Sequence, residues 1–349
     1  MTELLRLEVY LDDCAARNPA VLPVCRTLLD LSKAGYQISK ILAHGPLAGQ
    51  LSEKLGESLD GDGQKVLDVM AHQILREALS NGHVRDFASE EAVTPEILDA
   101  HGTLAVAVDP LDGSSNIDTL APIGTIFSIL PATGENPFLQ PGRNQLAAGF
   151  LIYGPQTALV LTLEEGTRIF TLHPERNIFM TASGNVKVPP QTREYAVNAS
   201  NQRHWEPAIA GYIGELLEGA SGPRQADFNT RWVASMVADA YRILIRGGVY
   251  LYPGDQRPNY GEGRLRLIYE ANPIALLMER AGAAASDGKS AILDIVPSSV
   301  HQRCPLIFGA SDEVARIAAA YAAPRLQASP LFNRRSLFRD SDTTIKQRA

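Results

Sequence analysis

The sequence predicts a layered fold of mixed helices and strands, with an α+β first half and an α/β second half. Three observations support this class. Apolar residues recur at helical spacing through roughly the first 80 positions, short apolar segments separated by Gly, Pro and Asn follow from 104 to 180, and helical and strand-like segments alternate after 191. A chain of 349 residues is long enough to build more than one core.

Helices dominate the prediction for the start of the chain. Leucine spacing indicates helices that begin near Leu4, Leu22 and Lys65, and Asn18-Pro19 separates the first two. The region 45–63 is rich in Gly, Ser and Asp, which predicts a mobile loop.

A meander of strands is predicted next. Glu90-Glu91 stand where a first strand would end. After them, Thr94-Pro95 predict the start of a helix, with Thr94 as the N-cap and Pro95 at the first helical position. The longest uncharged run, 144–163, is broken by Gly154-Pro155 and indicates two strands joined by a turn rather than a membrane span. The predicted meander strands are 104–109, 123–130, 146–153, 157–163, 167–172 and 176–180.

A composition shift at 183–193, with Pro189-Pro190, predicts the boundary between the halves. We therefore expect a first domain at 1–190, a second at 191–324 and a flexible tail at 325–349. Helices are predicted at 205–218, 233–245, 273–281 and 312–322, and strands at 194–198, 248–252, 265–270, 292–295 and 305–308. Asn272-Pro273 would start the third of these helices and Gly282 would end it.

Composition excludes several classes of protein. The net charge of −7 argues against a nucleic-acid partner or an anionic membrane surface, because both favour a basic face. Cys14, Cys25 and Cys304 are few, odd in number and scattered, so neither a disulfide framework nor a zinc site is indicated. This cysteine usage fits a reducing cytoplasm, so a cytoplasmic location is expected. The segment 1–13 carries several charges and lacks the apolar core of a signal peptide.

The strongest chemical signal is the segment 108–118, Val-Asp-Pro-Leu-Asp-Gly-Ser-Ser-Asn-Ile-Asp. Asp109 is predicted to end a buried strand and Asp112-Gly113 to turn the chain, which brings two carboxylates into one small volume. Such charges repel unless a cation lies between them. Gly113, Ser114 and Ser115 offer N–H and hydroxyl groups that suit a phosphate oxygen. The alternative is an ordinary surface turn, since Asp, Gly and Ser are common in turns.

Further acids stand at predicted element boundaries. For Glu90-Glu91 the alternative to a functional role is a solvated acidic turn. For Glu270 and Asp68 it is an acid in the first turn of a helix, where the helix dipole favours negative charge. Glu270 would also end a strand of the α/β layer, which is where ligands bind. Five acids with the Leu111 carbonyl would form an oxygen set that selects Mg²⁺ or Mn²⁺. Two or three such ions can hold phosphate oxygens and activate water, so no Cys or Ser nucleophile is required.

Basic residues near these acids fit an anionic substrate. Arg231 precedes a tryptophan, and Arg264 and Arg266 flank the predicted strand that leads to Glu270. Arginine can bind a phosphate with two parallel hydrogen bonds, which lysine cannot do. For each arginine taken alone, a surface salt bridge is the alternative.

With these residues in view, the chain resembles class I fructose-1,6-bisphosphatase, within the lithium-sensitive sugar and inositol phosphatase superfamily, over roughly 20–322. The segments that carry the resemblance are 88–91, 108–118, 123–127, 139–143, 235–239, 251–253, 265–273 and 301–303. The resemblance implies a five-layer α-β-α-β-α sandwich, a homotetramer and Mg²⁺-dependent hydrolysis of the 1-phosphate of fructose 1,6-bisphosphate, in gluconeogenesis or a Calvin-type cycle.

The resemblance also implies the site residues. The ligands of two to three Mg²⁺ ions, or of Mn²⁺, would be Glu90, Glu91, Asp109, the Leu111 carbonyl, Asp112 and Glu270. Asp68 and Glu91 would orient and deprotonate the attacking water. The substrate near its 1-phosphate would be held by Asp112, Gly113, Ser114 and Ser115. The 6-phosphate would be held by Asn198, Tyr252, Arg264 and Arg231, the last reaching across a subunit interface. The region 45–63 would be a loop that closes over the site.

Several positions depart from the family pattern. Arg264 stands where lysine is usual, and Trp232 and Asn201 replace tyrosines of animal members. The segments 18–22 and 103–104 correspond to the AMP site of those members and lack its cation and hydroxyls, so weak or absent AMP inhibition is predicted. The regulatory cysteine insertion of chloroplast forms is also missing, so thiol control is not expected.

Three other functions compete with this prediction. Sedoheptulose-1,7-bisphosphatase activity, alone or as a dual activity, differs by one sugar carbon. Inositol monophosphatase would leave the basic residues of the second half without a second phosphate. A non-catalytic phosphate or metal sensor is expected to have lost at least one carboxylate, and this chain has them all.

Overall fold

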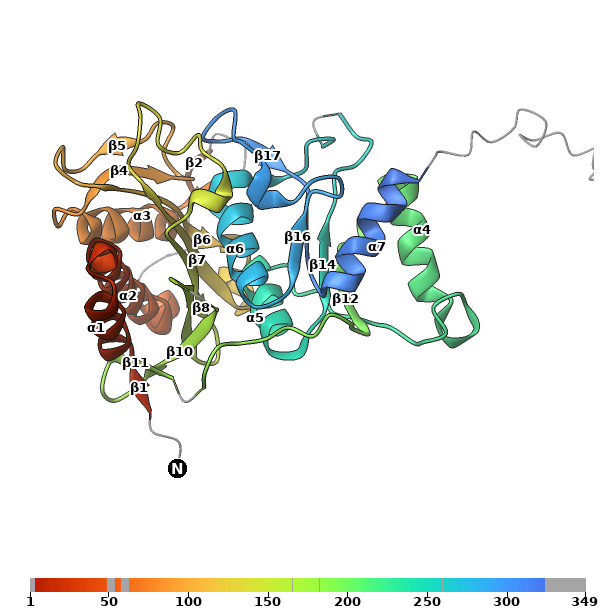
Figure 1. Ribbon diagram of the computed structural model, residues 1–349, viewed down its shortest axis with the longest axis horizontal. Coiled ribbons are helices and arrows are strands. Elements are labelled where there is room, and N and C mark those ends of the chain that lie inside the picture. Colours follow the sequence, from red (N-terminus) through yellow and green to blue (C-terminus); the bar gives the residue numbers. More distant parts are fainter. Residues whose placement is uncertain are drawn as a thin grey trace, which may run out of the picture.

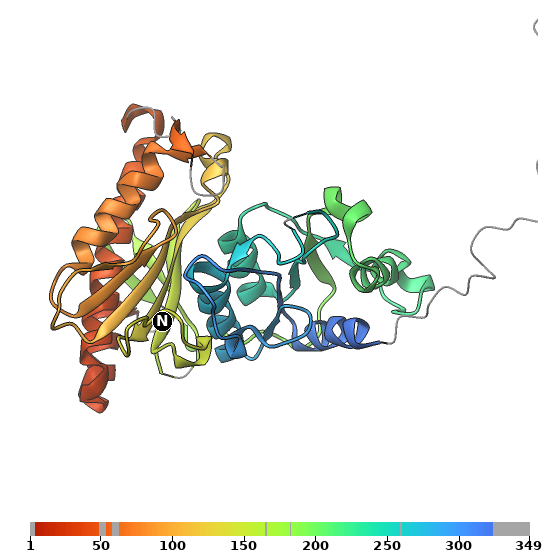
Figure 2. The same cartoon turned by 90° about the horizontal axis from the view of Figure 1, so that it is seen from above.

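The computed structural model describes residues 4–48, 54–57, 63–164, 166–181, 183–258 and 260–323, and in it five layers stack in the order α-β-α-β-α (Figures 1 and 2). Three helices cover the outer face of a large sheet, two helices lie between this sheet and a smaller one, and two more cover the far face of the smaller sheet. The predicted layered fold class is confirmed.

The first layer contains three helices, as predicted. They are α1 (Leu7–Arg17), α2 (Leu22–His44) and α3 (Val66–Leu79). Asn18 ends α1, and its side chain accepts a hydrogen bond from the Ala20 amide, so the break falls where the sequence places it.

The predicted loop at 45–63 is only partly a loop. A 3₁₀ turn covers Gly45–Ala48, and the strands β2 (Lys54–Glu57) and β3 (Gly63–Lys65) pair antiparallel. The pair was not predicted because its short polar strands carry no alternation of apolar residues. Residues 49–53 and 58–62, which belong to the same prediction, lie outside the described residues.

The large sheet has the strand order β1-β11-β10-β9-β8-β7-β6-β4-β5. It is antiparallel throughout except for the parallel pair β4 and β6. Its strands are β1 (Leu5–Arg6), β4 (Val84–Ser89), β5 (Glu96–Ile97), β6 (Leu104–Asp112), β7 (Ile123–Pro131), β8 (Ala147–Tyr153), β9 (Thr157–Thr162), β10 (Arg168–His173) and β11 (Ile178–Thr181). All six predicted meander strands are present.

Alternate residues of these strands enter different cores. Leu159 and Leu161 of β9 pack against the helices of the first layer, whereas Ala158 and Val160 face the helices between the sheets. Because both faces are buried, the strands read as nearly continuous apolar runs.

Two predictions at the edge of this sheet are wrong. The helix expected at Thr94-Pro95 is absent from the described residues there: strand β5 pairs with β4, and Arg76 makes hydrogen bonds of 2.6 and 2.9 Å with both carboxylate oxygens of Glu96. Strand β6 does not stop at Asp109 but runs on to Asp112 through a bulge. A bulge tolerates Pro110, which cannot donate a ladder hydrogen bond.

The smaller sheet has the order β13-β12-β14-β18-β16. Its strands are β12 (Glu194–Val197), β13 (Asn229–Thr230), β14 (Val249–Tyr252), β16 (Ala284–Ser286) and β18 (Leu306–Gly309). The middle helices are α5 (Met236–Arg246) and α6 (Asn272–Arg280), and the outer helices are α4 (Pro207–Leu217) and α7 (Ser311–Ala322). A separate pair joins β15 (Leu265–Arg266) to β17 (Arg303–Cys304).

The strand predicted at 265–270 is mostly helical. After β15 the chain forms a π-helical turn, Leu267–Ala271, in which the Asn272 amide bonds to the Leu267 carbonyl, and this turn continues directly into α6. Asn272 is therefore a helical residue and not the predicted N-cap. The cause of the error is that all five residues of the turn are buried, and a short buried apolar run does not distinguish strand from helix.

The strand predicted at 292–295 is likewise wrong, because Ile292–Asp294 form a 3₁₀ helix. The division at 190 stays a prediction, since α5 and α6 pack on both sheets in one continuous core. The tail, 325–349, lies outside the described residues.

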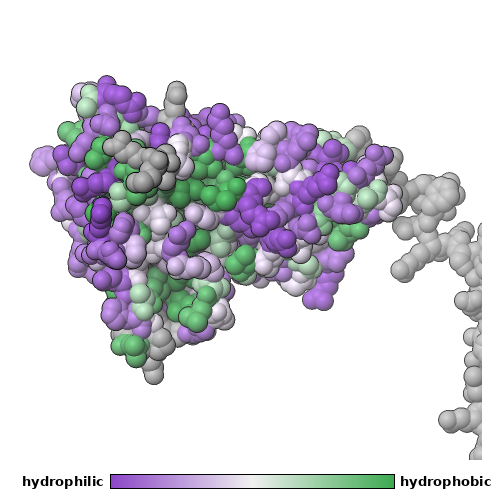
Figure 3. All heavy atoms as spheres, turned by 90° about the horizontal axis from the view of Figure 1, so that it is seen from below, coloured by the Kyte–Doolittle hydropathy of each residue, from purple (hydrophilic) through white to green (hydrophobic). Residues whose placement is uncertain are grey.

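Among the described residues, no helix combines the length and the apolar character needed to cross a membrane. On the face drawn in Figure 3, hydrophilic side chains predominate and apolar ones form separate patches.

Candidate active site

A bulge at the end of β6 directs two acids of the central motif. Between Asp109 and Asp112 the register with β7 shifts, so the residues between them have no ladder partner on that strand. The Thr125 hydroxyl donates a 2.8 Å hydrogen bond to the Pro110 carbonyl, and the Leu111 amide donates one of 2.9 Å to Oδ1 of Asp109. These bonds fix the bulge and the carboxylate of Asp109.

Three buried carboxylates meet at this point. Asp109, Asp112 and Glu270 each offer an oxygen that lies within 4.8 Å of the others. The π-helical turn brings Glu270 inward, where it accepts a hydrogen bond from the Arg266 amide. The structure thus brings together acids that are more than 150 positions apart in the sequence.

The electrostatics of this cluster favour a cation. Burial raises the pKa of Asp109 and of Glu270 well above the ordinary value, and the negative charge of Glu90 raises both further. Burial also raises the pKa of Asp112, to about 6. Like charges buried this closely are costly unless a cation neutralises them, and hard oxygen donors suit Mg²⁺ or Mn²⁺. The donor set therefore fits such ions.

The parallel pairing of β4 with β6 places the second acidic segment beside the first. The Glu90 amide donates a 3.0 Å hydrogen bond to the Val108 carbonyl, so the carboxyl ends of the two strands lie together. Arg266 faces Glu90, with its Nε 3.5 Å from a carboxylate oxygen. The charge of Glu91 acts instead on Asp68, whose pKa it raises.

Asp68 lies in the first turn of α3 and is buried. Its Oδ2 accepts a 2.9 Å hydrogen bond from the Lys65 amide, whereas the buried Oδ1 has no hydrogen-bond partner among the described residues. Burial raises the pKa of this carboxyl to about 6 against the opposing effect of the Lys65 amide.

The turn after Asp112 forms as predicted. Gly113 has a φ of +76°, in the left-handed region that glycine tolerates, and a 3₁₀ helix at Ser114–Thr119 follows. The Lys65 side chain donates a 2.6 Å hydrogen bond to the Ser114 carbonyl, and Ser115 is exposed. The roles predicted for these residues and for the Leu111 carbonyl stay predictions.

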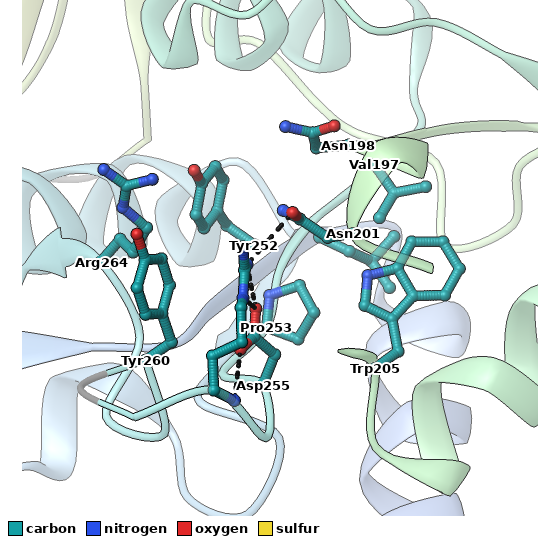
Figure 4. Close-up of a pocket in the computed structure, with 11 residues that line it drawn as sticks. Val197, Asn198, Asn201, Trp205, Tyr252, Pro253, Asp255, Tyr260 and Arg264 are labelled. Atoms are coloured by element: carbon teal, nitrogen blue, oxygen red, sulfur yellow. Dashed lines mark hydrogen bonds and ion pairs between the residues drawn. The ribbon is translucent and has the colours of Figure 1, made fainter. Parts of the chain in front are cut away.

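A pocket lies at the end of β14 (Figure 4). It is lined by Val197, Asn198, Asn201, Trp205, Leu251, Tyr252, Pro253, Asp255, Arg257, Tyr260 and Arg264. Three of the four residues predicted for the 6-phosphate, Asn198, Tyr252 and Arg264, are thus brought together. Arg231 is not among the lining residues: its Nε lies 3.7 Å from a carboxylate oxygen of Glu194.

An aromatic stack connects the pocket to the acidic cluster. The ring of Tyr250 lies 5.7 Å from Trp232 and 6.4 Å from Tyr252, centroid to centroid. Burial raises the pKa of Tyr250, and the charges of Asp112 and Glu270 contribute to the rise. Tyr250 is therefore influenced by the acidic cluster on one side and packs against Tyr252 of the pocket on the other.

Sequence reasoning missed several residues here. Thr125 anchors the bulge from within the quoted segment 123–127, and Arg257 and Tyr260 line the pocket from a loop without any periodic pattern. No single-sequence signal marks the loop residues.

Comparison with known proteins agrees with this geometry. The family models described as fructose-1-6-bisphosphatase, N-terminal domain and C-terminal domain, match residues 27–183 and 188–322. The class 1 fructose-1,6-bisphosphatases of Acidiphilium cryptum and Azorhizobium caulinodans are 58% and 52% identical, covering 99% and 90% of this chain and 99% and 98% of their own. The chain belongs to the fructose-1,6-bisphosphatase family.

A solved structure supports the same assignment. The holo form of Leishmania major fructose-1,6-bisphosphatase superimposes with a TM-score of 0.84 at 29% identity, covering 92% of this chain and all of its own. The predicted membership of the fructose-1,6-bisphosphatase family, a family of phosphoric monoester hydrolases, is confirmed.

Proposed function

We propose that this protein hydrolyses the 1-phosphate of fructose 1,6-bisphosphate, giving fructose 6-phosphate and phosphate, at the cluster of Asp109, Asp112 and Glu270. The observation that carries the proposal is this buried cluster, within 4.8 Å, next to a pocket that contains Arg264. The family assignment supplies the substrate.

Divalent ions are proposed to fill the acidic cluster. Two to three Mg²⁺ ions, or Mn²⁺, would be held by Glu90, Glu91, Asp109, the Leu111 carbonyl, Asp112 and Glu270. When bound, such ions neutralise phosphate charge and make water more acidic. The raised pKa of the three buried carboxyls supports this occupancy, because a cation would offset the cost of burying their charge and, at Asp109 and Glu270, the repulsion from neighbouring acids.

Asp68, with Glu91, is proposed to orient the attacking water and accept its proton. A base must be held still and have a free acceptor atom. The Lys65 amide holds Oδ2 of Asp68, and its buried Oδ1 remains as the acceptor. A pKa of about 6 leaves the carboxylate ionised at neutral pH yet basic enough to take a proton.

The two ends of the substrate would be bound separately. Gly113, Ser114 and Ser115, with Asp112, would hold the sugar near the 1-phosphate. The 6-phosphate would be held by Asn198, Tyr252, Arg264 and, from a neighbouring subunit of a homotetramer, Arg231. The exposed position of Arg231, whose side chain is 46% accessible, supports a reach across an interface. A cytoplasmic location is part of the same proposal.

Phosphate release in the presence of Mg²⁺ tests the proposal. The substrates are fructose 1,6-bisphosphate, sedoheptulose 1,7-bisphosphate and inositol monophosphate, each with the native chain and with Asp112→Ala. We expect the fructose substrate to be preferred and the variant to lose activity, while Asp13→Ala, an exposed acid of α1, serves as the matched control. Equal rates for the native chain and Asp112→Ala would remove the metal-site argument, and a preference for either other substrate would reassign the function.

A further inference from the structure

The pocket contains a second arginine, Arg257, that is paired with a carboxylate of the same loop. Its Nε lies 3.0 Å from each carboxylate oxygen of Asp255, and a second nitrogen of its guanidinium bonds to the same carboxylate. That nitrogen also donates a 3.1 Å hydrogen bond to the Asn201 side chain. Asp255 is buried, and the arginine lowers the pKa of its carboxyl, so the pair is held ionised. The charge of Arg257 is therefore already paired with a buried carboxylate.

Arg264 differs in its surroundings. Within the described part of the chain its guanidinium has no carboxylate within salt-bridge distance, and its contact is the ring of Tyr260, 5.1 Å from guanidinium carbon to ring centroid. Arg257 contacts the same ring at 4.2 Å. In Figure 4, Arg264, Tyr260 and Tyr252 point in the same direction from the floor of the pocket. The Tyr260 ring thus contacts two arginines: Arg257, which is paired with Asp255, and Arg264, which has no carboxylate partner among the described residues.

The backbone holds Tyr260 in place. Its carbonyl accepts hydrogen bonds of 3.1 Å from the amides of both Asp255 and Gly263, and its own amide donates one of 3.1 Å to Arg257. Gly254 lies so close to this loop that a Cβ there would be 2.4 Å from the Gly261 carbonyl oxygen. These contacts fix the backbone of the loop from which the Tyr260 ring projects.

We infer that Tyr260 is a positioning residue that fixes the guanidinium of Arg264 for the distal phosphate of the substrate. A long side chain loses conformational freedom when it binds, so holding it beforehand strengthens binding. A planar guanidinium stacks on an aromatic face better than an ammonium does, which accounts for arginine at 264 in a chain with Tyr260 beside it. The inference rests on the proposed function for the identity of the ligand, and deepens it.

Binding of fructose 6-phosphate, followed by calorimetry, tests the inference without turnover. For Tyr260→Leu we expect Kd to rise about five-fold, and KM for fructose 1,6-bisphosphate to rise equally with kcat unchanged. Tyr260→Phe keeps the ring and should bind like the native chain. The matched control is Tyr36→Leu, which removes a ring that Lys40 covers at 5.5 Å on α2 and should change neither constant. For fructose 1-phosphate, which has no distal phosphate, Tyr260→Leu and the native chain should be equal.

A double-mutant cycle makes the test independent of any one variant. Arg264→Lys should weaken binding in the native background and add little in Tyr260→Leu, because the stack is already lost there. Any of three results would overturn the inference. The effects of the two substitutions on binding free energy could be fully additive, Tyr260→Leu could bind with native affinity, or Tyr260→Phe could lose as much affinity as Tyr260→Leu. If Tyr260→Leu does not fold, native affinity in Arg264→Lys overturns it. Failure of the native chain to hydrolyse the bisphosphate overturns the proposed function alone, because fructose 6-phosphate binding is measured separately.

Discussion

The amide of Val237 donates a 3.0 Å hydrogen bond to Oδ2 of Asp112, across 125 positions of sequence. The first turn of α5 therefore closes over the acidic cluster, and its unpaired amides favour an ionised carboxylate. These amides oppose the effect of burial, which raises the pKa of Asp112 to about 6.

The metal-free protein should lose stability as the pH rises. Because the folded pKa of Asp112 lies above its unfolded value of 3.8, the folded state binds more protons between those values, and the free energy of unfolding falls as pH increases from about 4 through 6. A shift of this size corresponds to about 3 kcal/mol, or several degrees in Tm. Thermal unfolding in a chelator at pH 4.5, 6 and 7.5 measures it.

The control for this experiment is Asp112→Asn, which removes the titrating group. It should unfold at a higher temperature than the native chain in chelator at pH 7.5, and added Mg²⁺ should stabilise it less than the native chain. A native Tm that is flat over this pH range without metal would contradict the explanation.

Asp68 should set the acidic limb of the pH–rate profile. A base must lose its proton to act, so kcat/KM at saturating Mg²⁺ should rise with pH through about 6, the raised pKa of this carboxyl. Asp68→Asn should lower kcat by roughly 10² to 10⁴-fold, the usual contribution of a general base. An activity limb near pH 4, or near-native activity in Asp68→Asn, would exclude this role.

The central acids could be placed from sequence because each lies near an element boundary. Glu90 and Asp109 follow runs whose apolar pattern predicts strands, and parallel pairing of β4 with β6 then brings them together. Glu270 was predicted to end a strand, whereas it lies in a π-helical turn. The run before it is buried on all sides, and only the pairing of two residues with β17 decides where the strand stops and the π-helical turn begins.

The pocket was less accessible to prediction. Asn198 and Tyr252 stand at strand ends, which the apolar pattern reveals, whereas Arg257 and Tyr260 belong to a loop held by backbone hydrogen bonds and close glycine contacts. Such contacts leave no periodic signal in a single sequence.

AMP should inhibit weakly or not at all. In the segment predicted to correspond to the AMP site, the Asn18 side chain caps the Ala20 amide, and the adjacent Arg17 is paired with Glu164 at 3.0 Å. Asn18 carries no charge, and Arg17 already has an acidic partner. We expect millimolar AMP to change the rate by less than about two-fold, below the five-fold or more that is typical of allosteric coupling. A steep AMP inhibition curve would contradict this prediction.

Arg231 should act on the site of a neighbouring subunit. Within its own chain it pairs with Glu194 outside the pocket, so a role at the 6-phosphate requires a second copy. Arg231→Ala should raise KM about ten-fold, as expected for loss of a charge-assisted phosphate contact. Light scattering should give about four times the chain mass of 37.8 kDa.

Subunit mixing then identifies the chain that supplies this arginine. Arg231→Ala keeps its acids and Asp112→Asn keeps its arginine. If the arginine crosses a symmetric interface, about one quarter of all sites in an equal co-expressed mixture would therefore be native. At low substrate, the mixture should exceed the mean of the two separate variants. If Arg231 acts within its own chain, no hybrid site is complete and the mixture will equal that mean.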